Sequence, residues 1–340
     1  MRPRLLILLL ACGTSMAATP PVLNWSELPS LPDRLGFAGS YAGISGGALI
    51  VAGGANFPDK PVWESGTKVW HDDIFVLERP DGAWRKCGQL PRAAGYGTSV
   101  TLPDGVLFIG GGDARENFRK VWKVSWNGKQ VDFLAWPDLP LPLAMSAGAL
   151  VGRTVYLAGG IDRPAVTSTR KIFLALDLDR VASGWRELEP WPGPDRAVAT
   201  AGAREGVFFL FGGSSGGAKR VWLRDAYAYV HGQGWHPLAQ LPWPVVAAPS
   251  PAPLAGGSCL LLLGGDDGHQ ADLPLATHRG FSRQVLAYDI TADKWTVLAE
   301  LPFSIVTTPL IQWDGRLIVP GGEARPGIRS AKIWSATFAP

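Results

Sequence analysis

The segment Leu317-Ile-Val-Pro-Gly-Gly-Glu-Ala-Arg-Pro-Gly-Ile-Arg-Ser330 joins two features around which the whole chain is organised. An apolar run ends at a Gly-Gly pair, and the turn that follows carries one carboxylate, Glu323, and two guanidinium groups, Arg325 and Arg329. The apolar run with two glycines occurs at five other places, but the charged turn occurs only here. We therefore expect one structural unit repeated six times, with a single copy that carries chemistry.

The spacing of the Gly-Gly pairs predicts the fold. Their second glycines fall at positions 54, 112, 160, 213, 265 and 322, so the repeats are 48 to 58 residues apart. A period of about fifty residues is typical of kelch-type β-propellers, in which each repeat forms a four-stranded blade around a central channel. The 42 glycines, 29 prolines and 15 tryptophans agree with many short strands and turns. We predict an all-β, six-bladed kelch-type β-propeller as a single domain over residues 18–340.

A second repeat, a Trp-containing strand followed by Leu-Pro, alternates with the first. The first such strand, around Trp25, precedes every Gly-Gly pair, and no strand of this kind with its Leu-Pro follows the sixth pair. A closed ring therefore requires residues 24–28 to supply the outer strand of the C-terminal blade, which leaves no sheet edge open. Both repeats have a purely architectural explanation, because glycine fits crowded backbone near the axis and tryptophan packs between blades.

The N-terminus predicts an export signal. A basic start precedes a short apolar stretch at residues 5–11, and small residues lie just before position 18. This pattern is typical of a signal peptide, here residues 1–17, which is too short to anchor a chain in a bilayer. We therefore predict a periplasmic protein without a membrane span. The alternative is a lipoprotein, because Leu9-Leu10-Ala11-Cys12 loosely resembles a lipidation site at Cys12.

The composition argues against several functions. Removal of the signal peptide lowers the formal charge from +3 to +1, and basic runs are absent, so we predict no nucleic-acid partner. The two cysteines that remain, Cys87 and Cys259, lie in different repeats, and we expect both to be free and buried. The five histidines lack metal-ligand spacing, so no metal site is predicted. The oligomeric state is left open, with a homodimer as one alternative.

The loops after Gly-Gly and after Leu-Pro meet around the central channel of a propeller, which is its usual ligand site. Glu323 follows its glycine pair directly, and Pro326-Gly327 predicts a turn that returns Arg329 beside it. The turn at residues 214–217 is expected to be a flexible loop. Arginine outnumbers lysine in these loops, which favours an anionic ligand held by bidentate contacts. Their other polar residues include Arg34, Asn56, Arg92, Arg196, Asp266 and Arg325.

Four segments of the chain resemble the N-acetylneuraminate epimerase family, the exported kelch-propeller mutarotases of sialic acid. They are Gly36-Phe-Ala-Gly-Ser-Tyr-Ala-Gly-Ile-Ser45, Ala52-Gly-Gly-Ala-Asn-Phe57, Arg92-Ala-Ala-Gly-Tyr-Gly97 and Gly322-Glu-Ala-Arg-Pro-Gly-Ile-Arg329. In the better-known members the Gly-Glu-Ala blade is internal, whereas here it ends the chain, so the chain resembles a cyclically permuted branch of the family. A closed ring tolerates this because each blade keeps its neighbours. The loop after Phe57 is shorter than in the family.

The resemblance implies an isomerase that interconverts the anomers of N-acetylneuraminate by acid/base ring opening and reclosure, without a cofactor. It places the catalytic glutamate at Glu323 and the arginine of the same motif at Arg329. We expect Glu323 to be ionised and to act first as a base, and Arg329 to hold the substrate carboxylate, assisted by Arg92 or Arg34. Further candidates for substrate binding are Asn56 and Arg325.

Two other functions remain open at this point. One is a periplasmic propeller that binds a glycan or a protein partner and performs no chemistry. The other is an enzyme of the same mechanism that acts on a different sugar acid or on an aldose.

Overall fold

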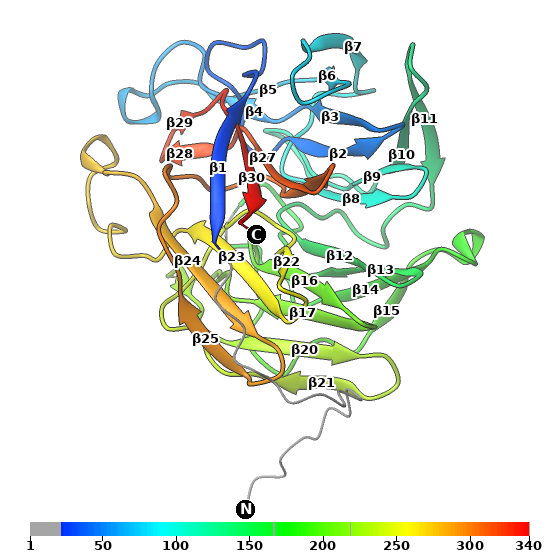
Figure 1. Cartoon of the computed structure of the whole chain (residues 1–340), viewed down its shortest axis with the longest axis vertical. Helices are drawn as coiled ribbons and strands as arrows, with labels where there is room; N and C mark the ends of the chain where they lie inside the picture. The colour runs from blue at the N-terminus through cyan, green and yellow to red at the C-terminus, as the bar shows by residue number, and fades with distance from the viewer. Residues whose placement is uncertain (1–21, 166, 218, 340) are drawn as a thin grey trace, which may run out of the picture.

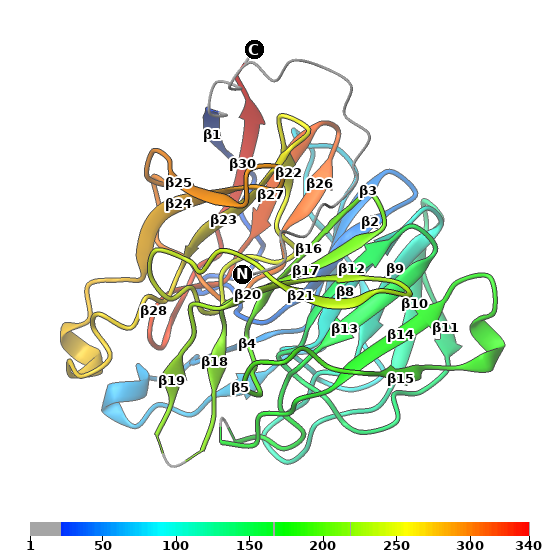
Figure 2. The same cartoon turned by 90° about the horizontal axis from the view of Figure 1, so that it is seen from below.

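A computed structural model gives the structure of residues 22–339, except residues 166 and 218. Within these residues the chain forms six four-stranded sheets, which are arranged as the blades of a β-propeller (Figures 1 and 2). The predicted all-β, six-bladed fold is therefore confirmed. No helix in this part of the chain is long and apolar enough to cross a bilayer. The predicted signal peptide, residues 1–17 with Cys12, lies outside the described residues.

Each blade is an antiparallel sheet of four strands, and the first strand of each sheet is the one that follows Leu-Pro or Trp-Pro. The first blade has β2 (Tyr41–Ser45), β3 (Ala48–Ala52), β6 (Asp73–Leu77) and β7 (Arg85–Gln89). The second has β8 (Thr98–Leu102), β9 (Gly105–Ile109), β10 (Val121–Trp126) and β11 (Val131–Trp136). The third has β12 (Ala147–Val151), β13 (Thr154–Ala158), β14 (Phe173–Asp177) and β15 (Arg186–Leu188).

The remaining three blades follow the same plan. The fourth has β16 (Thr200–Arg204), β17 (Val207–Phe211), β20 (Ala226–Val230) and β21 (Gly234–Pro237). The fifth has β22 (Leu254–Ala255), β23 (Cys259–Gly265), β24 (Ser282–Asp289) and β25 (Lys294–Val297). The sixth has β26 (Ile311–Trp313), β27 (Arg316–Pro320), β30 (Ile333–Phe338) and β1 (Leu23–Leu28).

The first and last strands of the chain close the ring. β1 pairs with β30 along its whole length, from Leu23 opposite Phe338 to Leu28 opposite Ile333, and Figure 1 shows the blue β1 beside the red β30. The predicted closure, in which the N-terminal strand completes the C-terminal blade, is confirmed. Pairing of this kind covers an edge that would otherwise expose unpaired backbone groups.

A second closure runs through the centre of the fold as a ring of six backbone hydrogen bonds. One residue of each blade donates its N–H to the carbonyl of the corresponding residue in the preceding blade, at 2.6–2.9 Å, and the bond from Gly39 to Thr307 joins the first blade to the last. All six residues have φ between 50° and 68°. This left-handed backbone is costly for residues other than glycine, so the ring holds five of its members in a strained conformation. They are Gly39, Tyr96, Met145, Val198, Ala247 and Thr307.

The two sequence repeats have the architectural roles expected of them. A Cβ at Gly110, the first of three consecutive glycines at residues 110–112, would lie 2.2 Å from the Leu143 carbonyl of the next blade, so glycine lets neighbouring blades approach. Four tryptophans, in or directly before an outer strand, donate their indole N–H to a backbone carbonyl of the preceding blade at 2.7–3.0 Å. The acceptor lies between the outer strand of that blade and the Leu-Pro or Trp-Pro step that follows it. These tryptophans therefore link adjacent blades. They are Trp84, Trp185, Trp235 and Trp295.

Three short hairpins and three single-turn 3₁₀ helices complete the described structure. The hairpins pair β4 (Ala55–Asn56) with β5 (Val69–Trp70), β18 (Ser214–Ser215) with β19 (Val221–Trp222), and β28 (Glu323–Arg325) with β29 (Ile328–Arg329). The helices are η1 (Val62–Glu64), η2 (Val181–Ser183) and η3 (Leu275–Thr277). The segments that carry η1 and η3 contact each other, and Figure 2 shows them side by side in light blue and gold.

The cysteine prediction is correct in one part and wrong in the other. Cys87 and Cys259 are both free, but each is half-buried. Cys87 lies on the outer strand β7, and Cys259 is the first residue of β23. Neither position reaches the packed centre of a sheet, which is why neither thiol is buried.

Candidate functional site

The charged turn after Gly322 forms the hairpin of β28 and β29, in which Glu323 lies opposite Arg329. Nη1 of Arg329 is 2.6 Å from Oε1 of Glu323, and the backbone N–H of Gly327 donates to the same oxygen at 2.7 Å. The Glu323 side chain is 18% exposed and the Arg329 side chain 4%. The predicted turn at Pro326-Gly327 therefore brings the two charged groups together.

Contacts with the first blade hold Arg329 in place. Its Nε donates to the carbonyl of Ala55 in β4 at 3.1 Å, and its guanidinium lies over the ring of Phe57, 5.1 Å from the centroid. Nη1 makes no hydrogen bond to any described residue, although it approaches Glu323 closely. Arg329 thus connects the last blade to the first, and its Nη1 lies in a buried position beside the Glu323 carboxylate.

Glu323 and Arg329 line a cavity of about 460 Å³ at one end of the propeller axis. The hydrogen-bonded ring contributes its floor, since five of the six ring residues line the cavity. A narrower space of about 90 Å³ continues beyond the ring and shares residues with a further space of about 480 Å³. The cavity is therefore continuous with the axial channel. Its size is typical of small-molecule sites.

Arg220 enters this cavity from the hairpin of β18 and β19. Its Nε donates to Oγ of Ser214 at 3.0 Å, and its guanidinium lies 4.8 Å from the ring centroid of Trp222. Nη1 is 3.9 Å from Oδ2 of Asp266, which also accepts a hydrogen bond from the Trp222 indole. Burial lowers the pKa of Arg220. The turn expected to be a flexible loop is therefore part of a hairpin that positions a cavity residue.

Lys68 lines the same cavity from the segment between η1 and β5. Its ammonium lies over two aromatic rings, 4.0 Å from the centroid of Tyr96 and 4.8 Å from that of Trp70. Burial and then the nearby Arg329 charge lower the pKa of Lys68 to about 8, while Glu323 acts in the opposite direction. Sequence reasoning missed both Lys68 and Arg220, although each directly precedes a short strand and lies two residues before a tryptophan.

His278 is a neutral member of the cavity wall. The side chain is buried, and its Nδ1 accepts a hydrogen bond from the backbone N–H of Gly280 at 3.1 Å. Because Nδ1 is an acceptor, this contact assigns the ring proton to Nε2. Burial lowers the pKa of His278, which favours the uncharged imidazole.

Two predicted ligand residues, Arg92 and Arg34, do not reach the cavity. Arg92 pairs with Asp113 at 2.5 Å and with Glu116 at 2.7 Å, and it lies over the ring of Phe118. Its charge is neutralised by the loop of the second blade. Arg34 is exposed. The expected assistance of these arginines in binding a substrate carboxylate is therefore not supported.

Two further candidates have their polar groups engaged next to the cavity. Asn56 is buried; its amide donates to the carbonyl of Gly36 at 3.1 Å, and its Oδ1 lies 2.8 Å from Nε2 of His71. Arg325 lies over the ring of Trp63 and donates to the carbonyl of His278 at 3.4 Å, which connects the η1 and η3 segments. Both residues stabilise the walls of the site, and neither side chain lines the cavity.

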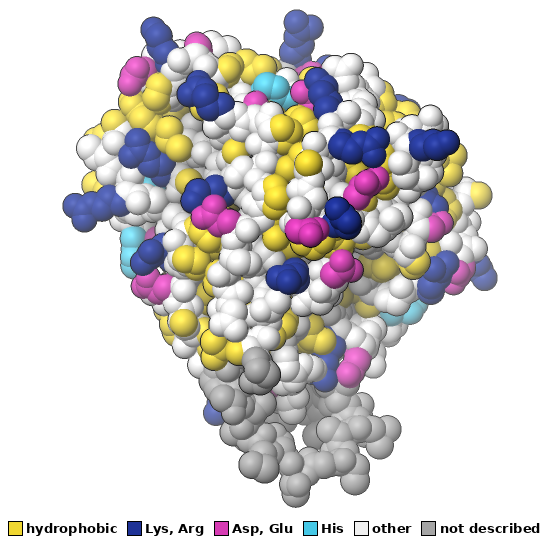
Figure 3. Space-filling view, turned by 45° about the horizontal axis from the view of Figure 1, so that its top comes forward, with side chains coloured by type: hydrophobic (Ala, Val, Ile, Leu, Met, Phe, Trp, Pro, Cys, Tyr) yellow, Lys and Arg dark blue, Asp and Glu magenta, His cyan; other side chains and the backbone are white. Residues whose placement is uncertain are grey.

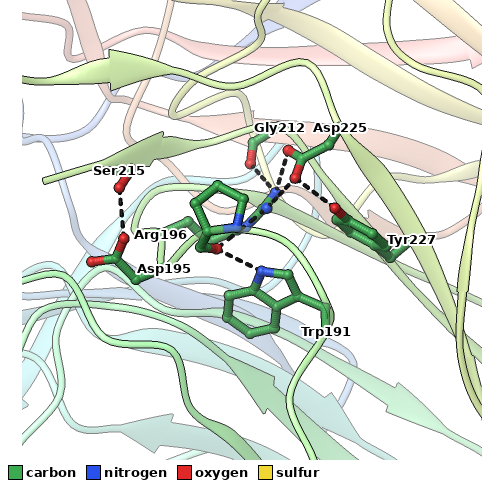
Figure 4. Close-up of polar contacts among 8 residues, drawn as sticks. Trp191, Asp195, Arg196, Gly212, Ser215, Asp225 and Tyr227 are labelled. Carbon is green, nitrogen blue, oxygen red and sulfur yellow. Dashed lines mark hydrogen bonds and ion pairs between the residues drawn. The ribbon is translucent and has the colours of Figure 1, made fainter.

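Arg196 is part of a buried structural cluster (Figure 4). It is 0% exposed and forms two contacts with Asp225, at 2.6 and 2.9 Å, and one with the carbonyl of Gly212 at 2.8 Å. Its guanidinium lies between the rings of Trp191 and Tyr227, and the Tyr227 hydroxyl donates to Asp225. These contacts satisfy the charge of Arg196 within the fourth blade.

On the face of the molecule drawn in Figure 3, basic and acidic side chains are interspersed over the surface. Among residues 22–339, apart from 166 and 218, no group of three His, Cys, Asp or Glu side chains is placed to hold a metal ion. The geometry therefore defines a six-bladed β-propeller with a cavity at one end of its axis, lined by a carboxylate that is paired with a buried arginine.

The sequence is similar to that of proteins named N-acetylneuraminate epimerase. Residues 14–133 match the family model described as N-acetylneuraminate epimerase. The N-acetylneuraminate epimerases of Haemophilus influenzae (strain PittEE) and Vibrio vulnificus (strain YJ016) are 36% and 38% identical to the chain over 124 and 126 residues, 32% of each chain. That of Yersinia enterocolitica is 28% identical over 230 residues, 58% of this chain and 56% of the relative.

The sequence resemblance is thereby confirmed: the chain is related to the N-acetylneuraminate epimerases. The match spans about a third of the length of the first relatives, and the charged hairpin at residues 322–329 lies outside the segment that the family model matches. A solved structure described as "Structure of YjhT" has the same fold, with a TM-score of 0.68 and 16% identity over 93% of this chain and 100% of that one. The cyclic permutation stays a prediction.

Proposed function

We propose that the protein is a mutarotase that interconverts the anomers of N-acetylneuraminate, with Glu323 as its acid/base group. The observation that carries this proposal is the setting of Glu323: a half-buried carboxylate at the axial cavity, paired with Arg329 in a propeller related to N-acetylneuraminate epimerases. Oε1 of Glu323 receives the contacts from Arg329 and Gly327. No contact of this kind holds Oε2 to the described residues, so this oxygen is the one that exchanges protons.

The proposed reaction needs only proton transfers. Oε2 accepts the proton of the anomeric hydroxyl, the bond between the anomeric carbon and the ring oxygen breaks, and Glu323 passes this same proton to the ring oxygen, directly or through a water molecule. The resulting open-chain 2-keto acid presents either face of its carbonyl to the same hydroxyl, and reversal of the steps closes the ring as the other anomer. Glu323 ends the cycle ionised, as it began. A positioned acid/base group contributes about 10²–10⁴-fold to the rate of such steps.

The charges that line the cavity suit a ligand with one negative charge. Lys68, Arg220 and Arg329 supply three cations, whereas Glu323 and Asp266 supply two carboxylates. N-acetylneuraminate carries a single carboxylate, attached to its anomeric carbon, so attraction of this group to the cations brings the reacting centre near Glu323. In this proposal Arg329 keeps Glu323 oriented and contributes to the attraction of the substrate.

A measurement of anomer exchange tests the function. NMR exchange spectroscopy on N-acetylneuraminate at mildly acidic pH, where spontaneous exchange is slow, is expected to show a rate that rises in proportion to protein concentration. Binding without acceleration would contradict the proposal and favour a non-catalytic propeller that binds a glycan. The same measurement on another 2-keto sugar acid and on an aldose identifies the substrate class, and faster exchange of either would replace N-acetylneuraminate as the substrate.

Export to the periplasm belongs to the proposal and rests on the sequence of residues 1–17. Mass spectrometry of the mature protein is expected to show an N-terminus near residue 18. A lipid-modified N-terminus at Cys12 would instead establish the lipoprotein alternative.

A further inference from the structure

Lys68 differs from the other cations that line the axial cavity. Arg329 is paired with Glu323 at 2.6 Å, and Arg220 has Asp266 at 3.9 Å. Lys68 makes no ion pair and donates no hydrogen bond to a side chain or carbonyl among the described residues. A half-buried cation without a carboxylate partner is stabilised when an anion binds beside it from solution.

The surroundings of Lys68 fix the position of its ammonium without neutralising it. The rings of Tyr96 and Trp70 lie 4.0 and 4.8 Å from the ammonium and attract it through their faces. Tyr96 also belongs to the hydrogen-bonded ring at the cavity floor, so one wall of the lysine pocket is part of the rigid centre of the propeller. The ammonium is therefore held at the cavity with its charge available.

The charged and titratable groups that act on Lys68 or contact it come from the β28–β29 hairpin and from the segment before β8. Glu323 of β28 and Arg329 of β29 act on it in opposite directions, and Tyr96 precedes β8 with a phenol whose pKa is raised by burial, so it stays neutral. Arg220 and Asp266 line the same cavity as a pair. The net effect of this environment is to disfavour the ammonium, and a bound anion would reverse that effect.

We infer that Lys68 is the principal contact for the carboxylate of a sugar-acid ligand, and that Arg329 serves mainly to hold Glu323. This inference rests on the proposed function and changes the role of Arg329 in it. The two side chains are distinguished by their partners: Arg329 already contacts a carboxylate and the Ala55 carbonyl, whereas Lys68 contacts only aromatic faces.

The inference predicts that ligand binding takes up a proton at alkaline pH. The pKa of Lys68 is about 8 in the free protein, and a carboxylate beside it raises that pKa because it stabilises the ammonium. Between the free and the bound pKa, binding therefore protonates Lys68. At pH 8 the uptake is expected to reach about half a proton per ligand, and near pH 6 it is expected to vanish because the ammonium is already formed.

Isothermal titration calorimetry at pH 8, in two buffers with different ionisation enthalpies, measures both affinity and proton uptake. The ligands are N-acetylneuraminate and its uncharged amide, in which CONH₂ replaces the carboxylate. Lys68→Met is expected to weaken binding of the acid by about 10–100-fold and to leave binding of the amide within about threefold. Lys68→Arg is expected to retain most of the affinity for the acid but no proton uptake, since arginine does not titrate at this pH.

Lys60→Met is the matched control, because Lys60 is an exposed lysine of the same connection between β4 and β5 and does not line the cavity. It is expected to leave both affinity and proton uptake unchanged. Equal weakening of the acid and the amide in Lys68→Met would show a merely structural role and overturn the inference, as would proton uptake that persists in Lys68→Met.

Failure of the inference is distinguishable from failure of the proposed function. If the wild-type protein accelerates anomer exchange while Lys68→Met binds the acid with unchanged affinity, only the role of Lys68 is overturned. If the wild-type protein binds neither ligand, both are overturned.

Discussion

Replacement of Glu323 by glutamine tests the acid/base role with little change of shape. The amide oxygen of glutamine still accepts the N–H of Gly327 and faces Arg329, which contact Oε1 at 2.7 and 2.6 Å in the wild-type protein. The substitution removes the group that accepts a proton. We therefore expect Glu323→Gln to slow anomer exchange by about 10²–10⁴-fold while the hairpin of β28 and β29 persists.

The same substitution has a stability cost that can be estimated from the burial of Arg329. The arginine side chain is 4% exposed, and the loss of a charged partner for such a group costs about 1–3 kcal/mol. In a domain of this size, 1 kcal/mol corresponds to about 2 °C in Tm. Glu323→Gln is thus expected to lower Tm by a few degrees, to leave unfolding cooperative and to remain folded at the temperature of the assay.

Rates from NMR exchange spectroscopy and Tm from calorimetry, on the same protein samples, separate the two effects. Glu300→Gln is the matched control, because Glu300 is also paired with an arginine, Arg283, at 2.5 Å, but is 47% exposed on the outer part of the fifth blade. It is expected to leave the exchange rate unchanged. Exchange by folded Glu323→Gln within about threefold of the wild-type rate would refute the acid/base role, since loss of that role costs at least 10²-fold.

Three further predictions concern the scaffold. Asp225→Ala leaves the fully buried Arg196 without its carboxylate partner, so urea denaturation is expected to show that the free energy of unfolding falls by about 3–5 kcal/mol. A fall below about 1 kcal/mol, typical of exposed pairs, would contradict this. Gly110→Ala and Gly152→Ala both place alanine at φ +58°, but only Gly110 has a carbonyl 2.2 Å from the new Cβ. Gly152→Ala is expected to cost about 1–2 kcal/mol and Gly110→Ala clearly more, and equal losses would show that inter-blade crowding is unimportant. Deletion of residues 22–28 removes β1 and exposes an edge of β30, so a lower Tm and concentration-dependent association are expected in calorimetry and light scattering, whereas an unchanged Tm in a monomer would contradict the closure argument.

The fold follows from the sequence because its determinants are local and repeated. The glycine repeats mark strand ends, and at Gly53, Gly110, Gly159 and Gly212 a Cβ would lie 2.2–2.4 Å from a carbonyl of the next blade. The absence of an outer strand after the last pair predicts that the N-terminal strand closes the ring, which is what the pairing of β1 with β30 shows. The pairing of Glu323 with Arg329 was also predictable, because both lie in one hairpin whose turn is marked by Pro326-Gly327.

The rest of the site depends on contacts between blades that no local pattern specifies. The sequence predicts Arg92 as a ligand for an anion. In the structure its charge is instead neutralised by Asp113 and Glu116 of the second blade. Lys68 gains its position from Tyr96, which precedes the inner strand of the next blade. The hydrogen-bonded ring could not be predicted from the sequence either. Its six members share a left-handed backbone, but only one of them is a glycine.

A crystal structure of the protein with bound N-acetylneuraminate provides the most direct test. We expect the sugar in the axial cavity, with its anomeric oxygen about 2.6–3.2 Å from Oε2 of Glu323 and its carboxylate toward the side of the cavity lined by cations. A sugar bound on the outer wall of a blade, or bound in the cavity with its anomeric centre turned away from Glu323, would contradict the account.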